Sequence, residues 1–103
     1  MIWRFKDYFD GENWLDVKVY PNGNKEYYLN GECHRADGPA VENTNGDKCY
    51  YLNNLPHRED GPAVEGVDGY KAYWLFGENY ASLPSPEEIE VIKKERIIGG
   101  VLL

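Results

Sequence analysis

The chain has 103 residues, of which 42% are hydrophobic and 15% aromatic, a content sufficient for one folded domain with a core. Eighteen acidic residues against eleven basic ones give a formal charge of -7, which argues against direct binding to nucleic acid or to an anionic membrane. No apolar stretch suits a signal peptide or a membrane span, so we expect a single domain over residues 1–103, located in the cytoplasm.

A peptide of nine residues occurs twice, as HRADGPAVE at 34–42 and as HREDGPAVE at 57–65, with eight of nine positions identical. The match extends into a unit of 23 residues, because NGNKEYYLNGEC, NGDKCYYLNNLP and DGYKAYWLFGEN superimpose at that spacing. The N-terminal stretches YFDGENW and DVKVYPNG fit the same scheme with three residues missing, so we predict one repeat array over residues 3–80. Units that stack on their neighbours explain such a duplication, whereas a catalytic motif rarely needs a second copy.

Each unit predicts two short strands, an aromatic one such as KEYYLN and a second that begins at PAVE. Asn-Gly and Asp-Gly pairs supply the positive φ that tight turns between such strands require. Pro39 and Pro62 stand at the first residue of a strand, where proline is tolerated. The pattern therefore predicts a mainly β protein, an antiparallel β-hairpin meander of about six to eight short strands.

Two rows of aromatic residues recur along the array, since alternation in a strand separates Tyr27, Tyr50 and Tyr73 from the residues that follow them. A single-layer meander with one helix cannot cover both faces. We expect the second row to stay partly open and to bind a protein, and packing of these rings between neighbouring repeats is the alternative. With an acidic rim added, the candidate binding residues are Tyr28, Tyr51, Trp74, Arg35, Arg58, Glu42, Glu65 and Asp68.

The segment SPEEIEVIKKERIIGG departs from the repeat and predicts a helix over about 86 to 98. Ser85 is a suitable N-cap, Pro86 suits the first helical position, and Glu88 is placed for a capping box. We expect residues 85–103, helix and tail together, to cover the open edge of the last strands. An oligomer formed through the helix is a second expectation.

The HRxDGP segments, residues 34–39 and 57–62, place histidine, arginine and aspartate close enough for acid-base chemistry. Two copies of one catalytic apparatus would be redundant, and no serine, threonine or cysteine nucleophile recurs beside them. We interpret them as turns in which aspartate accepts hydrogen bonds from turn amides, arginine pairs with aspartate or a neighbouring repeat, and histidine satisfies a buried carbonyl. No residue is predicted to be catalytic; the structural turn residues are His34, Asp37, Gly38, His57, Asp60 and Gly61.

The cysteines, Cys33 and Cys49, occupy different positions in the repeat, and Pro56 stands where the next unit would repeat Cys33. We therefore predict two reduced thiols, one in a loop and one in a strand. Zinc binding by Cys33, His34 and His57 is disfavoured, because the set does not recur and no CxxC exists. Signatures of phosphate-binding loops are also absent from the sequence, so we expect no metal and no cofactor.

The period of 23 residues, the aromatic strand and the HRxDGPA signature resemble the MORN-like repeats of YwqK-type antitoxin-like proteins and of small phage and bacterial proteins. The resemblance covers about residues 3–80 and is strongest over 25–66. Arg35 and Arg58 replace the glycine that usually follows the histidine, so the lipid and kinase functions of other MORN proteins are not carried over. The resemblance implies a β-hairpin array that binds something, without assigned catalytic residues.

We therefore expect a non-enzymatic protein that binds and inhibits another protein. The small size, the acidity and the phage-like resemblance favour a phage- or bacteria-encoded inhibitor of a toxin or of a host defence enzyme, for example one that occupies a basic nucleic-acid site. A phage-encoded inhibitor would act in the host cytoplasm. The alternative is a protein that sequesters a nucleotide, in which aromatic rings stack on the base and the duplicated His-Arg pairs hold the phosphates.

Overall fold

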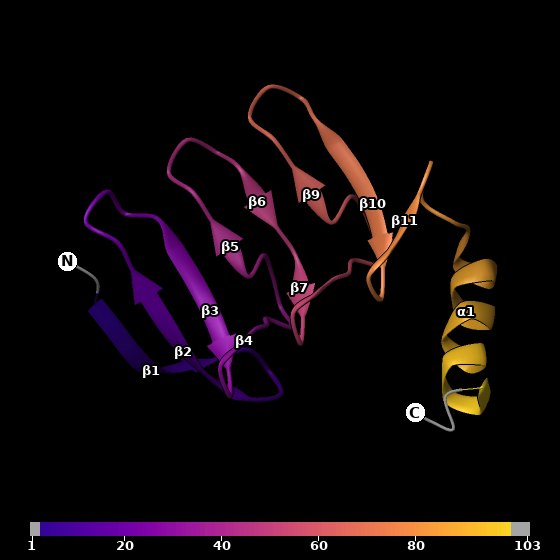
Figure 1. The fold of residues 1–103 in the computed structure, drawn as a ribbon, viewed down its shortest axis with the longest axis horizontal. Helices are drawn as coiled ribbons and strands as arrows, with labels where there is room; N and C mark the ends of the chain where they lie inside the picture. The colour runs from indigo at the N-terminus through magenta and orange to yellow at the C-terminus, as the bar shows by residue number, and fades with distance from the viewer. Residues whose placement is uncertain (1–2, 100–103) are drawn as a thin grey trace.

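The computed structural model describes residues 3–99, which form a thin array of β-hairpins that ends in one helix (Figure 1). The principal-axis extents are 43 × 32 × 18 Å, so the array is a single layer of sheet. Residues 1–2 and residues 100–103 of the predicted tail lie outside the described residues. The elements are β1 (Trp3–Phe9), β2 (Trp14–Val19), β3 (Lys25–Leu29), β4 (Glu32–Cys33), β5 (Val41–Glu42), β6 (Lys48–Cys49), β7 (Tyr51–Leu52), β8 (Leu55–Pro56), β9 (Val64–Glu65), β10 (Lys71–Leu75), β11 (Glu78–Tyr80) and α1 (Pro86–Gly99).

The predicted antiparallel meander is confirmed, and its register repeats with the sequence. The main sheet has the order β1-β2-β3-β5-β6-β9-β10-β11, with β4 paired to β3, and β7 and β8 form a separate ladder. Val41 pairs with Cys49, and Val64 pairs with Ala72 one period later. Successive units in Figure 1 therefore lie side by side as near copies.

The prediction of six to eight strands was too low, because the described residues contain eleven. The short return strands β4, β8 and β11 each pair with the end of an aromatic strand. The aromatic strand of the middle unit is also interrupted at Tyr50 into β6 and β7. In contrast, β3 stays continuous, since β2 pairs with it from Lys25 to Tyr28.

Each unit has a hairpin turn of two residues with positive φ, and the three turns lie at the same end of their units. These pairs are Asn30–Gly31, Asn53–Asn54 and Phe76–Gly77, with φ between 49° and 84°. Asparagine and glycine adopt this conformation readily, and Asn-Gly is a preferred pair for such turns. Phe76, at φ 51°, is an unusual residue in this position, because bulky side chains rarely adopt positive φ. Its surroundings must therefore hold it there.

The hydrophobic core is small and divided along the array. Leu15, Val17 and Tyr27 form one buried cluster in the N-terminal unit. Leu75 and Ile89 are buried at the other end. Between the two ends of the array, the buried hydrophobic residues are the alanines Ala40, Ala63 and Ala72. Burial of large apolar side chains therefore contributes little in the middle of the array, where polar contacts must join the units.

The predicted helix is present and caps the last strands. Ser85 and Glu88 form the predicted capping box, with Ser85 N donating to Glu88 Oε1 at 3.0 Å and Glu88 N donating to Ser85 Oγ at 3.2 Å. In Figure 1 the helix stands beside β11 at the end of the array. Within residues 3–99, α1 is neither long nor apolar enough to cross a membrane. That the helix also serves an oligomer stays a prediction.

The helix cap gives a first test. Ile89 is 5% exposed and Val91 is 54% exposed on the same helix. Ile89→Ala should lower the free energy of unfolding by about 2–5 kcal/mol, because it leaves a cavity under the cap. Val91→Ala, the matched control, should change it by less than about 0.5 kcal/mol. Urea denaturation followed by circular dichroism measures both, and equal effects would mean that the helix does not pack as described.

Candidate binding surfaces

Each HRxDGP segment closes into a clamp around its arginine. Arg35 Nε donates to Asp37 Oδ1 at 2.7 Å, Arg35 Nη1 donates to Pro39 O at 3.1 Å, and the guanidinium lies 4.3 Å from the centroid of the Tyr27 ring. The second segment repeats these contacts at 2.9, 3.1 and 4.2 Å, from Arg58 to Asp60, Pro62 and Tyr50 respectively. Aspartate was predicted to accept hydrogen bonds from turn amides, and its observed partner is the arginine. The predicted pairing of arginine with that aspartate is confirmed.

The glycine of each clamp makes room for the guanidinium. A Cβ atom added at Gly38 would lie 3.0 Å from Arg35 Cζ, and one at Gly61 would lie 2.9 Å from Arg58 Cζ. Neither glycine has positive φ, so close approach, and not backbone conformation, explains the residue type at this position.

The two histidines join each unit to the next. His34 Nδ1 accepts a hydrogen bond from Asn53 N at 3.1 Å, and His57 Nδ1 accepts one from Phe76 N at 3.0 Å. Both imidazoles are buried, with 6% and 7% of their surface exposed. The prediction that histidine satisfies a buried carbonyl was wrong, because each imidazole instead accepts the amide of a positive-φ turn residue. These two inter-unit bonds satisfy amides that point out of their own hairpins.

The other imidazole nitrogen explains the single mismatch between the two nine-residue peptides. His57 Nε2 bonds Glu59 Oε2 at 3.1 Å within its own segment. Ala36 stands at the corresponding position of the first segment, and the nearest carboxylate to His34 Nε2 is Asp10 Oδ2 at 3.9 Å, with no hydrogen-bond partner for that nitrogen. A carboxylate therefore faces each buried histidine, from inside the repeat in one case and from the β1–β2 turn in the other.

Asp10 is buried yet well bonded. Its carboxylate accepts hydrogen bonds from the backbone N–H groups of Glu12, Asn13 and Ala36 at 3.0, 2.8 and 2.8 Å. Burial alone would raise the pKa of Asp10, but these three donors and the nearby His34 outweigh it, so the pKa lies below its ordinary value. The carboxylate thus stays charged and fastens the N-terminal unit to the first HRxDGP segment.

The structure divides the predicted binding residues between two faces of the sheet. Arg35 and Arg58 lie on the face of Tyr27 and Tyr50, here called the clamp face. Their side chains are only 13% and 22% exposed. Two of the predicted acidic residues are on the same face, since Glu42 and Glu65 come within 3.6 and 3.5 Å of Arg35 and Arg58. Asp68 lies apart in a turn and accepts a hydrogen bond from Tyr70 N.

The predicted row Tyr28, Tyr51 and Trp74 lies on the opposite face, and all three side chains are half-buried. Each is paired across its hairpin with a return strand, to Cys33, Pro56 and Asn79 respectively. The Tyr28 ring is partly covered, because Lys18 Nζ lies 4.4 Å from its centroid and its hydroxyl donates to Glu26. Burial, reinforced by Glu26, raises the pKa of Tyr28. The row is thus neither core nor fully open.

Sequence reasoning missed the most exposed aromatic residues of this face. Trp14 is 62% exposed and Phe9 is 47% exposed, and their ring centroids lie 5.2 Å apart. Trp14 and Lys18 share one side of β2 by strand alternation, which puts Trp14 on the face of Tyr28. The repeat alignment gave no sign of this exposure, because it places Trp14 at the position of the buried His34. We call Phe9, Trp14, Tyr28, Tyr51 and Trp74 the aromatic face.

A groove of about 610 Å³ opens on the clamp face between the two HRxDGP segments. Tyr50 and Leu52 contribute to its lining, as do both arginines and four carboxylates, those of Glu12, Asp37, Glu59 and Asp60. Its lining therefore carries more negative than positive charges.

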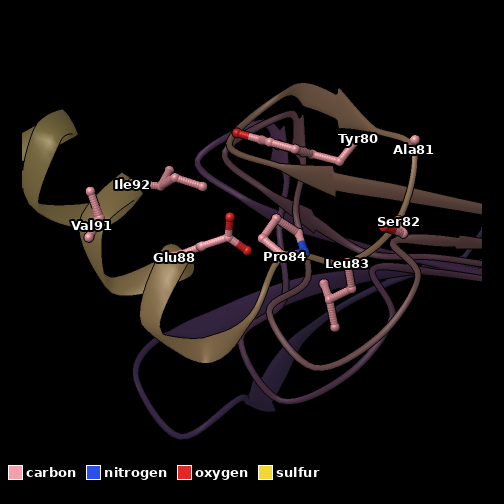
Figure 2. Close-up of a pocket in the computed structure, with 8 residues that line it drawn as sticks. All are labelled: Tyr80, Ala81, Ser82, Leu83, Pro84, Glu88, Val91 and Ile92. Carbon is pink, nitrogen blue, oxygen red and sulfur yellow. The ribbon is translucent and has the colours of Figure 1, made fainter.

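A second pocket, of about 530 Å³, lies between the last strand and the helix cap. Figure 2 shows Tyr80 and Pro84 on one side of it and Glu88 and Ile92 of α1 on the other. The pocket exists because a short connection leads from β11 to α1 and leaves a space between the strand and the helix.

Both cysteines are free thiols. Cys33 lies in β4 and Cys49 in β6, so the prediction that one of them lies in a loop was wrong. Burial raises the pKa of Cys33 to about 11, with a smaller effect of Glu26 and Cys49, and the thiol is therefore protonated at neutral pH. In the part of the chain that the structure describes, no three histidine, cysteine or acidic side chains are grouped to hold a metal ion.

No family model, no curated protein and no solved structure matches this chain. The resemblance to MORN-like repeats therefore stays a prediction. The geometry of the two faces carries the functional interpretation.

The inter-unit bond of His57 predicts a dependence of stability on pH. Burial lowers the pKa of His57 below 6.5, and Lys93 and Arg96 lower it further against the opposing effect of Glu59. The unfolded chain then binds a proton at His57 more readily than the folded chain does. The stabilisation by neutral His57 is therefore complete above about pH 6.5 and is lost as the pH falls towards the folded pKa. The free energy of unfolding of the wild type should drop between about pH 8 and about pH 5.

His57→Asn is the control for this prediction, because an amide oxygen can accept the bond from Phe76 N without titrating. The variant should lose less stability over the same pH range. If the wild type and the variant show parallel pH dependences in urea denaturation, His57 is not the group responsible.

The two clamp aspartates should differ in their contribution to stability. The Asp37 side chain is 40% exposed and also accepts a hydrogen bond from Tyr8 OH, whereas that of Asp60 is 85% exposed and bonds only Arg58. Asp37→Ala should therefore cost about 1–2 kcal/mol, and Asp60→Ala less than about 1 kcal/mol. Thermal melts compare the two variants. A larger loss for Asp60→Ala would contradict this assignment of the contacts.

Proposed function

We propose that this protein is a non-enzymatic binding module that captures another protein through its aromatic face. The observation that carries the proposal is the solvent-exposed pair of Phe9 and Trp14, whose rings are in tilted contact and continue the row of Tyr28, Tyr51 and Trp74. Tryptophan and tyrosine are enriched among the residues that dominate binding energy at protein interfaces. An exposed tryptophan beside half-buried rings offers a partner a large apolar contact at low entropic cost.

The contacts that stabilise the fold do not involve the exposed aromatic residues that we propose to bind the partner. The inter-unit bonds and the arginine clamps use histidine, arginine and aspartate side chains, and none of them uses Phe9 or Trp14. These two side chains therefore stay exposed without a stabilising role in the contacts that join the units. Large exposed apolar groups of this kind mark interaction sites more often than chance exposure.

The charge of the chain favours a basic partner. A formal charge of -7 speeds association with a positively charged surface and slows association with acidic ones. Together with the small size, this supports the role of an inhibitor of a toxin or a host defence enzyme, encoded by a phage or a bacterium and acting in the cytoplasm. A partner with a basic nucleic-acid site fits this charge.

Nucleotide sequestration has no comparable support. It would require the guanidinium groups of Arg35 and Arg58 to hold phosphates, and both are already bonded to carboxylates and backbone carbonyls. The groove between them carries additional carboxylates, which repel phosphate.

Affinity capture of the partner from host lysate, followed by binding measurements with the purified pair, tests the proposal. Trp14→Ser should weaken binding by about 2 kcal/mol or more, the scale of an interface hot spot, with an unchanged circular dichroism spectrum. Tyr70→Ser is the matched control, since Tyr70 is 59% exposed but lies in the turn between β9 and β10. Trp74→Ser should also weaken binding, with some loss of stability because this side chain is half-buried.

The proposal fails if Trp14→Ser and Trp74→Ser both bind the captured partner with the affinity of the wild type. It also fails if native mass spectrometry of the purified protein finds a bound nucleotide that the same substitutions release.

A further inference from the structure

Tyr8 occupies a defined site against the first HRxDGP segment. Its hydroxyl donates a hydrogen bond to Asp37 Oδ2 at 2.6 Å and accepts one from Arg35 Nη2 at 2.9 Å. Its ring meets the Tyr27 ring edge to face, with centroids 5.2 Å apart. Arg35 Cζ lies 4.8 Å from the centroid of Tyr8 and 4.3 Å from that of Tyr27, so the guanidinium contacts both rings. Three groups thus recognise one phenol.

The second HRxDGP segment has the same three groups without the phenol. Arg58 lies 4.2 Å from the Tyr50 centroid and bonds Asp60 through Nε, as Arg35 does with its own partners. Among residues 3–99, Arg58 makes its hydrogen bonds through Nε and Nη1, and no hydroxyl approaches Nη2. The Asp60 side chain is 85% exposed, against 40% for Asp37. Asp60 and Arg58 Nη2, the counterparts of the two groups that hold the Tyr8 hydroxyl, are therefore open to solvent.

The clamp-face groove lies over these open groups. Tyr50, Arg58 and Asp60 all line it, and they are the counterparts, one period later, of the three residues that contact Tyr8. Its volume of about 610 Å³ is within the range of pockets that enclose small ligands. The groove is thus a second copy of the Tyr8 site in which no residue of the described chain is seated.

In the first unit the carboxylate of Asp10 faces the buried histidine and accompanies Tyr8. In the second unit a guest does not need to supply such a carboxylate. Asp10, two residues after Tyr8, faces His34, whereas Glu59 already bonds His57 from within its own segment. The groove lining sets two arginines against four carboxylates. This balance favours a guest with basic or neutral neighbours over an acidic one.

We propose that this groove binds a tyrosine side chain of a partner protein. The phenol donates a hydrogen bond to Asp60 and accepts one from Arg58 Nη2, and its ring packs edge-on against Tyr50, as Tyr8 does in the first unit. The site lies on the clamp face and is separate from the aromatic face, so it is a second contact surface and does not depend on the first.

A peptide titration followed by NMR tests the proposal. The probe is the blocked peptide Gly-Lys-Tyr-Lys-Gly, and the control peptide has phenylalanine in place of tyrosine. The tyrosine peptide should shift the backbone amide resonances of Tyr50, Arg58 and Asp60 at millimolar concentration. The phenylalanine peptide should bind about tenfold more weakly or worse, because it cannot form the hydrogen bonds to Asp60 and Arg58.

Substitutions on the protein locate the effect. Asp60→Ala removes the acceptor at an exposed position and should reduce binding of the tyrosine peptide about tenfold. Glu87→Ala removes the same charge from the exposed first turn of α1 and should leave binding unchanged. Tyr8→Ala empties the first site, and the peptide should then also shift the amide of Tyr27, which contacts Tyr8 and does not line the groove.

Three results would overturn the assignment: no shift of the Tyr50, Arg58 and Asp60 amides at millimolar peptide, equal binding of the two peptides, or an equal effect of Asp60→Ala and Glu87→Ala. Loss of partner capture through Trp14→Ser would leave this site unaffected, so the two proposals can fail independently.

Discussion

Beyond the sheet ladder that runs through the units, the array depends on the hydrogen bond from a turn amide of one unit to a buried imidazole of the unit before it. Asn53 and Phe76 each begin a two-residue turn, and their N–H groups find an acceptor in the preceding unit and not in their own hairpin. His34 and His57 supply it. Among the side chains that the structure describes, Leu15 and Leu75 are the only large ones buried to below 2%, so hydrophobic burial contributes little to joining the units. Each unit is complete only when its neighbour is in place.

Much of the fold follows from local rules applied to a strict repeat. The Asn-Gly turns, the capping box of Ser85 and Glu88 and the period of 23 residues are visible in the sequence, and the meander and helix cap were predicted from them. The contacts of the histidines were not, because an imidazole that accepts an amide 19 residues away is decided by the packing of neighbouring units. The exposure of Trp14 was missed for the same reason. Strand alternation can place Trp14 on a face but cannot show how much neighbouring strands cover it.

Departures from the repeat mark the places where a unit lacks its usual neighbour. Glu59 supplies a carboxylate that the first segment takes from Asp10, so one substitution inside the peptide reflects a contact from outside it. At the other end, Tyr80 and Ala81 replace the histidine and arginine of the signature. Within residues 3–99, no further hairpin follows β11, so this stretch offers no turn amide for a histidine to accept. The chain instead turns into the N-cap of α1, whose Arg96 lies over the Phe76 ring at 4.2 Å and covers the last turn.

The placement of these links on one face separates stability from recognition. The arginine clamps and their aspartate and glutamate partners lie on the clamp face, where each clamp holds its own unit together. Trp14 and Phe9 lie on the opposite face and take no part in those bonds, so their side chains can change with little effect on the fold. If an apolar core held the units together, these aromatic side chains would be required for packing and could not change without loss of stability. In this protein the polar links between units leave the exposed rings of Phe9 and Trp14 on the opposite face available for a partner.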